Sequence, residues 1–271
     1  MTRFLCQTCG VQYPDSEAPP TECPICLDER QYVGHGGQRW TSIEDLAAAG
    51  HTNTIREEES GLTSIRTSPQ AGIGQRALLV RTPNGNVLWD CISYLDAATV
   101  EAVRALGGIQ AIAISHPHFY ASNMTWSEAF ENAPIYLHAS DREWCVFEHE
   151  NVVHWEGDAI VPVEGVSLIH LGGHFEGAQV LHWPGGDEGR GVLLSGDTVA
   201  VVMDRRYVSF MYSYPNEIPL SEGTIRRIAG RLSEYRFNRI YGAFPGRTVF
   251  EDGNAAVAKS AERYIENLRG R

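Results

Sequence analysis

Residues 109–118 read Ile-Gln-Ala-Ile-Ala-Ile-Ser-His-Pro-His, an apolar run that ends in two histidines. A short apolar run rich in isoleucine predicts a buried strand. The histidines follow directly, so we expect them at the carboxyl end of that strand. Ligands of open α/β sheets bind at such ends. The stretch therefore places a candidate functional site at His116 and His118.

The chain before this strand predicts a β–α–β unit. Apolar strands at 77–80 and 87–90 flank an Asn-Gly turn. Apolar residues at helical spacing run from Leu95 to Gly108, where two glycines end the helix. The alternation continues downstream through a strand at 191–194. Further helices are expected at residues 140–149, 220–236 and 253–269. This pattern predicts two sheets with helices outside them.

Two later strands also end in groups that can bind a metal ion. A glycine pair precedes His174, and Gly196 precedes Asp197, each after an apolar run. Glycine permits the sharp backbone turns that aim such side chains. A neutral imidazole offers a lone pair to zinc at ~2.0–2.1 Å. The expected ligands of one metal ion are His116, His118, His174 and Asp197.

The order of these residues resembles the metallo-β-lactamase superfamily over residues 75–250. The resemblance rests on Asp90, His116-Pro-His118, Gly-His174 and Gly-Asp197. It implies an α+β fold, an αββα sandwich with the metal centre at one edge of the two sheets. It also implies a hydrolase repertoire with one or two zinc ions, or sometimes iron. Within that family pattern, Asp90 would steady the ligand loops, the histidines would bind the first ion and Asp197 would bridge two ions.

The sequence departs from the family pattern at the second metal position. The family motif His-x-His-x-Asp-His would place Asp and His where this chain has Tyr120 and Ala121. A further family histidine is missing from residues 241–244. Because one carboxylate cannot hold a second ion, we expect a mononuclear centre. Three imidazoles would hold the ion, with either Asp197 or a water completing the shell.

A mononuclear zinc centre predicts a hydrolase of a small ester, thioester, lactone or amide. A zinc-bound water has its pKa lowered toward ~7, and zinc polarises a substrate carbonyl. Asp197 is the expected general base. Tyr120 is either a donor to a developing oxyanion or a packed aromatic. Aromatic residues and arginines in 203–219 are candidates for a pocket wall, and Arg247 for pairing with Asp197 or an anionic substrate group.

Two other functions stay open at this point. His116, His174 and Asp197 form a two-histidine, one-carboxylate set, which suits non-haem iron. That alternative is a mononuclear iron oxidoreductase of the persulfide type, with iron at the histidine site. The other alternative is a metal-binding protein that has lost catalysis along with its second metal site.

Four cysteines predict a separate metal site near the N-terminus. Two Cys-x-x-Cys knuckles can complete a tetrahedral sulfur shell, whose binding energy supplies folding energy. The knuckles, with Gly10 and Pro24, resemble a rubredoxin-like zinc ribbon over residues 6–26. We expect structural zinc in a ribbon of residues 1–35, ahead of a metallo-β-lactamase-like domain of residues 36–271. The cysteine ligands are Cys6, Cys9, Cys23 and Cys26.

The composition disfavours other partner classes. The chain has 22 Lys plus Arg against 34 Asp plus Glu, a net charge of −12. Nucleic acids and anionic membrane surfaces both attract basic faces. No run approaches the ~18 apolar residues of a spanning helix, and the first residues lack an apolar targeting segment. We therefore expect a cytoplasmic protein whose partner is a small-molecule substrate, with neither nucleic acid nor membrane involved.

Overall fold

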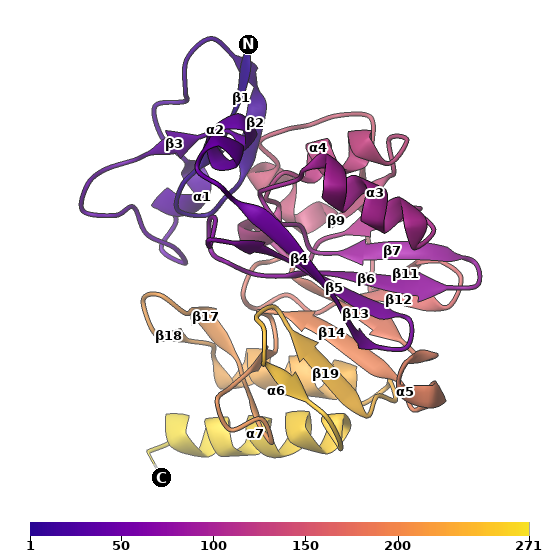
Figure 1. Ribbon diagram of the computed structural model, residues 1–271. Helices are drawn as coiled ribbons and strands as arrows, with labels where there is room; N and C mark the ends of the chain where they lie inside the picture. Colours follow the sequence, from indigo (N-terminus) through magenta and orange to yellow (C-terminus); the bar gives the residue numbers. More distant parts are fainter. Residues whose placement is uncertain (271) are drawn as a thin grey trace.

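The computed structural model describes residues 1–270 and contains two β-sheets packed face to face, with helices outside both (Figure 1). One sheet has seven strands and the other has six. Helices α3 (Ala97–Ala105) and α4 (Asn123–Ala129) cover the first sheet, and α6 (Glu222–Leu232) and α7 (Gly253–Leu268) cover the second (Figure 1). This confirms the predicted αββα sandwich.

The seven-stranded sheet carries the strand predicted at residues 109–114. In spatial order its strands are β10 (Val152–Trp155), β9 (Ile135–His138), β8 (Ala111–Ala113), β7 (Gly85–Trp89), β6 (Ala77–Thr82), β5 (Leu62–Ser68) and β4 (Thr52–Glu59). β7 and β8 are parallel and joined through α3, as predicted. Asp96 caps α3 by accepting a hydrogen bond from the Thr99 N–H at 2.8 Å. The parallel crossover brings the carboxyl ends of β7 and β8 to the same edge.

The six-stranded sheet brings its own loops to the same region. Its order is β11 (Ala159–Val163), β12 (Val166–His170), β13 (Gln179–Trp183), β14 (Val192–Gly196), β19 (Arg239–Gly242) and β20 (Thr248–Val249). The smaller elements are α5 (Gly186–Gly189) and the strand pairs β15 (Ala200–Val201) with β16 (Val208–Ser209) and β17 (Met211–Ser213) with β18 (Ile218–Pro219). A buried cluster between the two sheets contains Trp89, Leu181 and Leu194.

The N-terminal ribbon forms a third, small sheet against one end of the sandwich (Figure 1). Its elements are β1 (Thr2–Cys6), β2 (Gln12–Ser16), β3 (Trp40–Thr41) and the helices α1 (Pro24–Leu27) and α2 (Ile43–Ala48). β1 pairs with β3, so the small sheet closes beyond the predicted boundary at residue 35. Cys9 and Ile25 of the ribbon share one hydrophobic cluster with Ile114 and Phe119 of the sandwich. The division into two domains remains a prediction.

The helix expected at residues 140–149 was wrong in type and length. The structure has a short 3-10 helix, η2 (Ala139–Trp144), which ends at an extended Cys145. Asp141 is buried and accepts a hydrogen bond from the Gly177 N–H at 2.7 Å. The Arg30 guanidinium lies 5.2 Å from the centre of a Trp144 ring. These contacts with distant residues override the local helical pattern.

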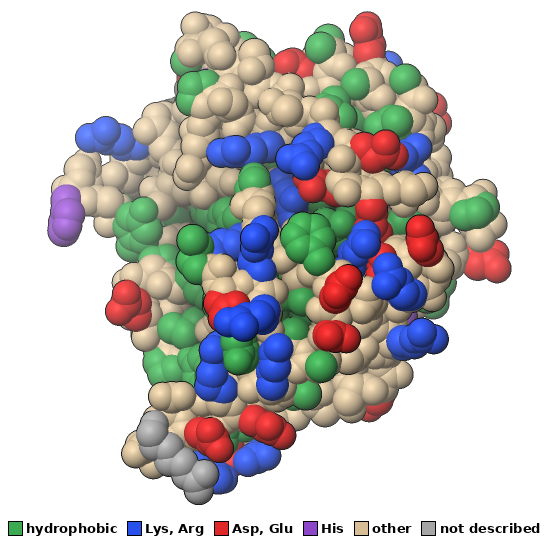
Figure 2. All heavy atoms as spheres, turned by 60° about the horizontal axis from the view of Figure 1, so that its bottom comes forward, with side chains coloured by type: hydrophobic (Ala, Val, Ile, Leu, Met, Phe, Trp, Pro, Cys, Tyr) green, Lys and Arg blue, Asp and Glu red, His purple; other side chains and the backbone are tan. Residues whose placement is uncertain are grey.

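Charges of both signs are mixed on the face that Figure 2 shows. Around α6, Glu222 pairs with Arg226 at 2.8 Å and with Arg269 at 2.6 Å. Such exposed pairs contribute little to stability. Of the helices within residues 1–270, none combines the length and apolar character that crossing a bilayer requires.

Candidate metal centre

Three histidines converge at the edge shared by the two sheets. His116 lies just before η1 (Pro117–Phe119) and His118 lies within it, in the segment that follows β8. His174 lies in the loop between β12 and β13. One ring nitrogen of each lies within 4.8 Å of those of the other two. All three side chains are buried. The structure therefore brings together the three imidazoles that the sequence singled out.

Asp90 and Ser115 hold the first ligand loop. Asp90 follows β7 in a left-handed conformation with φ of 58°, and its Oδ1 accepts hydrogen bonds at 2.8 Å from both the N–H and the Oγ–H of Ser115. The Ser115 Oγ lies 2.8 Å from His116 Nδ1. Since the Ser115 hydroxyl donates to Asp90, it accepts from His116 Nδ1–H, which leaves the lone pair on Nε2. His116 Nε2 is buried and has no hydrogen-bond partner within residues 1–270.

Backbone carbonyls orient the third ligand in the same way. His174 Nδ1 lies 2.8 Å from the Tyr212 carbonyl oxygen and 3.2 Å from that of Met211. Nδ1–H donates to these oxygens, so Nε2 keeps its lone pair and lies 3.3 Å from His118 Nδ1. Ligand histidines usually donate their second ring nitrogen to such a partner. A single metal ion between the rings would satisfy the facing nitrogens together.

The imidazoles are held in the neutral form that metal binding needs. Burial lowers the pKa of His116 and of His118 well below the usual value, and the neighbouring His174 lowers both further. Burial also lowers the pKa of His174 to about 4, although its two carbonyl partners act in the opposite direction. An orphaned buried nitrogen and three neutral rings fit one metal ion. Nitrogen donors of this kind suit zinc or iron.

Asp197 faces the same region from the end of β14. Gly196 before it has φ of +52°, and a Cβ there would lie 2.5 Å from Ser115 Oγ. Glycine therefore lets β14 end directly against the loop of the first two ligands. Burial raises the pKa of the Asp197 carboxyl to about 7. Within residues 1–270, the group whose ligand atoms all lie within 4.8 Å contains the three histidines and not Asp197.

A cavity of about 500 Å³ opens above the histidines. His118, His174 and Asp197 line it, together with Arg247 and a mainly apolar wall. The predicted wall segment 203–219 contributes its members Met203, Tyr214 and Pro215. Among the ion pairs of residues 1–270, none joins Arg247 to Asp197. The pairing of Arg247 with an anionic substrate group stays a prediction.

Tyr120 lies behind the ligand loop. It is 3 % exposed and belongs to the hydrophobic cluster shared with the ribbon. Burial raises the pKa of its phenol well above the usual value, and the nearby carboxyl groups of Asp141 and Glu148 raise it further. Tyr120 is not among the residues of the described chain that line the cavity. Its role as a proton donor remains a prediction.

Sequence reasoning missed three groups that shape the centre. Ser115 directly precedes His116. Ser115 and Asp90 follow neighbouring predicted strands, so the sequence could have indicated their hydrogen bond. The Tyr212 carbonyl and the ribbon residue Arg30, whose guanidinium Nη1 lies 3.5 Å from the His174 carbonyl oxygen, had no such signal. A backbone acceptor carries no residue signature, and Arg30 is distant in sequence from the ligand it contacts.

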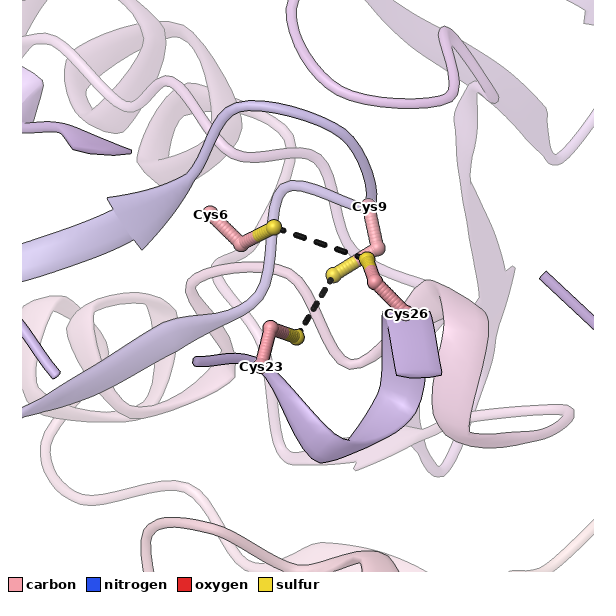
Figure 3. A group of neighbouring side chains, drawn as sticks. All are labelled: Cys6, Cys9, Cys23 and Cys26. Carbon is pink, nitrogen blue, oxygen red and sulfur yellow. Dashed lines mark hydrogen bonds between the residues drawn. The ribbon is translucent and has the colours of Figure 1, made fainter. Parts of the chain in front are cut away.

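The four ribbon cysteines point toward one another (Figure 3). The Sγ atoms of Cys6 and Cys26 lie 3.5 Å apart, and those of Cys9 and Cys23 lie 3.7 Å apart. A disulfide would require ~2.05 Å between sulfurs. Zn–S bonds of ~2.3 Å in a tetrahedral shell place sulfurs about 3.8 Å apart. The four-cysteine cluster therefore fits one tetrahedral metal ion, as predicted.

A third group of potential ligands lies outside the cavity. Ligand atoms of Cys145, Glu148 and His154 all lie within 4.8 Å of one another, and His154 Nε2 is 2.9 Å from Glu148 Oε1. None of the three lines the cavity within residues 1–270. Metal analysis of this protein therefore needs variants that separate the three groups.

Comparisons with known proteins agree with this geometry. The family model described as "Metallo-beta-lactamase superfamily" matches residues 72–258. The chain is 47 % identical over 269 residues to the Bacillus subtilis (strain 168) protein "Uncharacterized protein YmaE", covering 99 % of this chain and 97 % of that one. Among solved structures, the DIM-1 metallo-beta-lactamase is similar with a TM-score of 0.60 and 17 % identity, covering 80 % of this chain and 98 % of its own. VMB-1 is similar with a TM-score of 0.58 and 12 % identity over the same shares of the two chains. At these identities the two structures support the fold alone.

Proposed function

This chain belongs to the metallo-beta-lactamase superfamily, and from that premise we propose that it hydrolyses a small ester, thioester, lactone or amide. Membership supports a metal-dependent hydrolase in general. The observation that carries the proposal is the convergence of three buried imidazoles, two of which line a cavity that Asp197 also lines. A catalytic zinc site has three protein ligands and one open position, and three histidines are one such set.

We propose zinc as the ion and His116, His118 and His174 as the residues that hold it. Bound zinc would polarise the substrate carbonyl and lower the pKa of the attacking water. Ser115 and the Tyr212 carbonyl orient two of the imidazoles, so their geometry is set before any ligand binds. Such preorganisation is what a metal-dependent hydrolase requires of its protein ligands.

Asp197 is the proposed general base. Its carboxyl group makes no hydrogen bond within residues 1–270, so its oxygens are available to a water in the cavity. The Tyr214 hydroxyl donates to the Asp197 backbone oxygen at 2.9 Å and holds this turn in place. Water would add to the acyl carbon while an Asp197 carboxylate oxygen takes its proton. The bond to the leaving oxygen, sulfur or nitrogen then breaks, and that atom receives the proton.

The cavity favours a small substrate with an apolar body. Val201, Val202 and Phe244 supply apolar wall, and Arg247 supplies a half-buried cation. An arginine fork binds carboxylates and phosphates through paired hydrogen bonds. We therefore propose a substrate whose acyl group or leaving group carries one anion at the Arg247 side. Loss of the second metal position makes phosphodiester cleavage a weaker candidate, since in-line displacement at phosphorus profits from two ions.

The test is a panel of chromogenic esters, thioesters, lactones and amides offered to the zinc-loaded full-length protein. We expect one class to be hydrolysed, no detectable turnover by His118→Ala, and a loss of about 10²–10⁴-fold in kcat for Asp197→Asn. Glu143→Gln, an exposed carboxylate outside the cavity, is the matched control. Zinc bound at the histidines with no hydrolysis of any class would reject the proposal.

Tyr120→Phe tests the proton-donor prediction in the same assay. Because Tyr120 is not among the cavity-lining residues of the described chain, we expect kcat to change by less than about threefold. A loss of about a hundredfold would establish the phenol as a donor in the reaction.

A further inference from the structure

The first cysteine knuckle ends against the loop that carries His116 and His118. The Gln12 N–H donates to the Ala121 carbonyl oxygen at 2.9 Å, and Ser93 Oγ donates to the Gly10 carbonyl oxygen at 3.0 Å. Gly72 of the sandwich packs directly on this knuckle, because a Cβ at Gly72 would lie 2.9 Å from Gly10 Cα. The residues that follow Cys9 therefore hold the segment just past His118.

The second cysteine knuckle ends against the segment that orients His174. Asn216 Nδ2 donates to the Glu29 and Gln31 carbonyl oxygens at 2.8 and 3.0 Å. The Tyr212 hydroxyl donates to Glu29 Oε1 at 2.8 Å, while the Tyr212 carbonyl accepts from His174 Nδ1. The residues that follow Cys26 are thus tied to the strand that fixes the His174 ring. Figure 1 shows the ribbon beside β17 and β18.

Arg30 extends this second contact to the histidines themselves. It is 4 % exposed, and Asp28 of the ribbon holds its guanidinium through two hydrogen bonds of 2.6 and 3.0 Å. The guanidinium carbon lies 3.9 Å from the centre of the Phe175 ring, and that ring lies 4.9 Å from the His118 ring. Gln31, the next residue, lines the cavity. The ribbon thus supplies both the support behind the ligands and part of the cavity wall.

The sulfur cluster is the point at which the two knuckles join. The close contacts pair Cys6 with Cys26 and Cys9 with Cys23, so each joins one knuckle to the other. Without an ion, four buried sulfurs have too few other partners to hold the knuckles together, since metal binding supplies the folding energy of such ribbons. Both contacts with the ligand loops would loosen together.

We propose that the four-cysteine ribbon is the positioning element of the histidine centre, so that the ion held by the cysteines sets how tightly the histidines bind theirs. The inference rests on the proposed function only for the statement that the three histidines bind a metal ion. Because the binding free energies of two coupled sites are linked, the histidine ion must tighten the ribbon site by the same factor. Losing the ribbon ion removes supports from both ligand loops, and losing the histidine ion loosens the segments that contact the two knuckles.

The experiment measures zinc affinity at each site in the full-length protein, by competition with a chromophoric chelator. Cobalt substitution reports the ribbon separately, through the strong thiolate-to-metal absorption that histidine ligands lack. Cys26→Ser is expected to weaken zinc binding at the histidines by at least about tenfold, the scale for lost supporting groups around a metal site. His174→Ala is expected to weaken the ribbon affinity by a similar factor, because the coupling of two binding sites is reciprocal. Ser233→Ala, at the end of α6 and outside all three groups of potential ligands, should change neither.

Two variants that keep all four cysteines guard against simple misfolding of the ribbon. Asp28→Asn removes the charge that holds Arg30, and Gly72→Ala pushes on Gly10 from the sandwich side. Both are expected to keep the cobalt–thiolate absorption and to weaken zinc at the histidines by about tenfold. Wild-type zinc affinity at the histidines in all three ribbon-side variants would overturn the inference.

Failure of this inference and failure of the proposed function give different results. Zinc binding at the histidines that responds to the ribbon variants, without hydrolysis of any substrate, rejects only the function. If the protein hydrolyses a substrate but its zinc affinity at the histidines is unchanged in the ribbon variants, only the coupling is rejected.

Discussion

The two metal-binding clusters of this protein are built in opposite ways. The cysteines come from one short segment of the ribbon, and their four sulfurs are enough donors to complete a tetrahedral shell. The histidines come from two loops on different sheets, and each of two rings depends on a further partner, Ser115 or the Tyr212 carbonyl. A full shell is typical of structural metal sites, and three donors with an open position are typical of catalytic ones.

The two clusters therefore make different demands on the fold. The ribbon site needs only its own two knuckles, so its ion contributes to folding directly. The histidine site needs the sandwich to be folded first, because the strand ends create the convergence. The ribbon then contacts both ligand loops.

The largest expected effect separates the two sites by stability. Cys23→Ser should destabilise the protein by about 3–5 kcal/mol and lower Tm by roughly 10 °C, because the structural ion is lost. His116→Ala should lower Tm by less, because the sandwich core folds by burial and only the binding free energy of the histidine ion is lost. Calorimetric unfolding of the two zinc-loaded variants checks this. Equal decreases in Tm would show that the two clusters contribute equally to the stability of the fold.

The next effect concerns how the two sheets meet at the histidines. Gly196→Ala places a Cβ against Ser115 Oγ in a left-handed backbone, so we expect about 1–3 kcal/mol of destabilisation and weaker zinc binding at the histidines. Gly223→Ala, on the exposed start of α6 where a Cβ meets nothing within 4 Å, is the matched control. Urea unfolding measures both. A Gly196→Ala protein as stable as wild type would contradict the close packing of Gly196 against Ser115.

A smaller effect tests the support of a single ligand. Ser115→Ala removes the acceptor of His116 Nδ1–H and the donor to Asp90, so zinc affinity at the histidines should fall about tenfold. The four-cysteine site should keep its ion, which cobalt absorption reports. Ser233→Ala at the end of α6 provides a hydroxyl deletion away from both sites. An unchanged zinc affinity in Ser115→Ala would mean that the ligand loop is held by other contacts.

The smallest effect is a dependence of stability on pH through Asp141. Burial raises the pKa of its carboxyl to about 7; Glu176 and Glu143 add to this rise, while the Gly177 N–H and Arg30 oppose it. Between ~4 and ~7 the unfolded chain has released this proton and the folded chain keeps it, so the contribution to stability falls as pH rises through that range. It is fully present below ~4 and lost above ~7.

Asp141→Asn removes this component while keeping an acceptor for the Gly177 N–H. Urea unfolding at about pH 5 and about pH 8 should show a smaller loss of stability for the variant than for wild type. Identical losses would mean that Asp141 ionises normally in the folded protein.

The sequence predicted what depends on local pattern. Strand 109–114 with its terminal histidines, the α3 crossover and the cysteine knuckles were all confirmed, because apolar period and donor spacing determine them. The contacts of Arg30 with Phe175 and of Asp141 with Gly177 join segments far apart in the chain. Such contacts leave no local pattern in the sequence. They explain why the helix predicted at residues 140–149 was wrong and why the role of the ribbon was not predicted.

The roles assigned to both clusters depend on the three histidines binding one metal ion. The decisive measurement is elemental analysis of wild type and His118→Ala, each purified in the same way without added metal. We expect the variant to contain one ion fewer per chain while its ribbon keeps its own. A His118→Ala protein with the same metal content as wild type would contradict that binding.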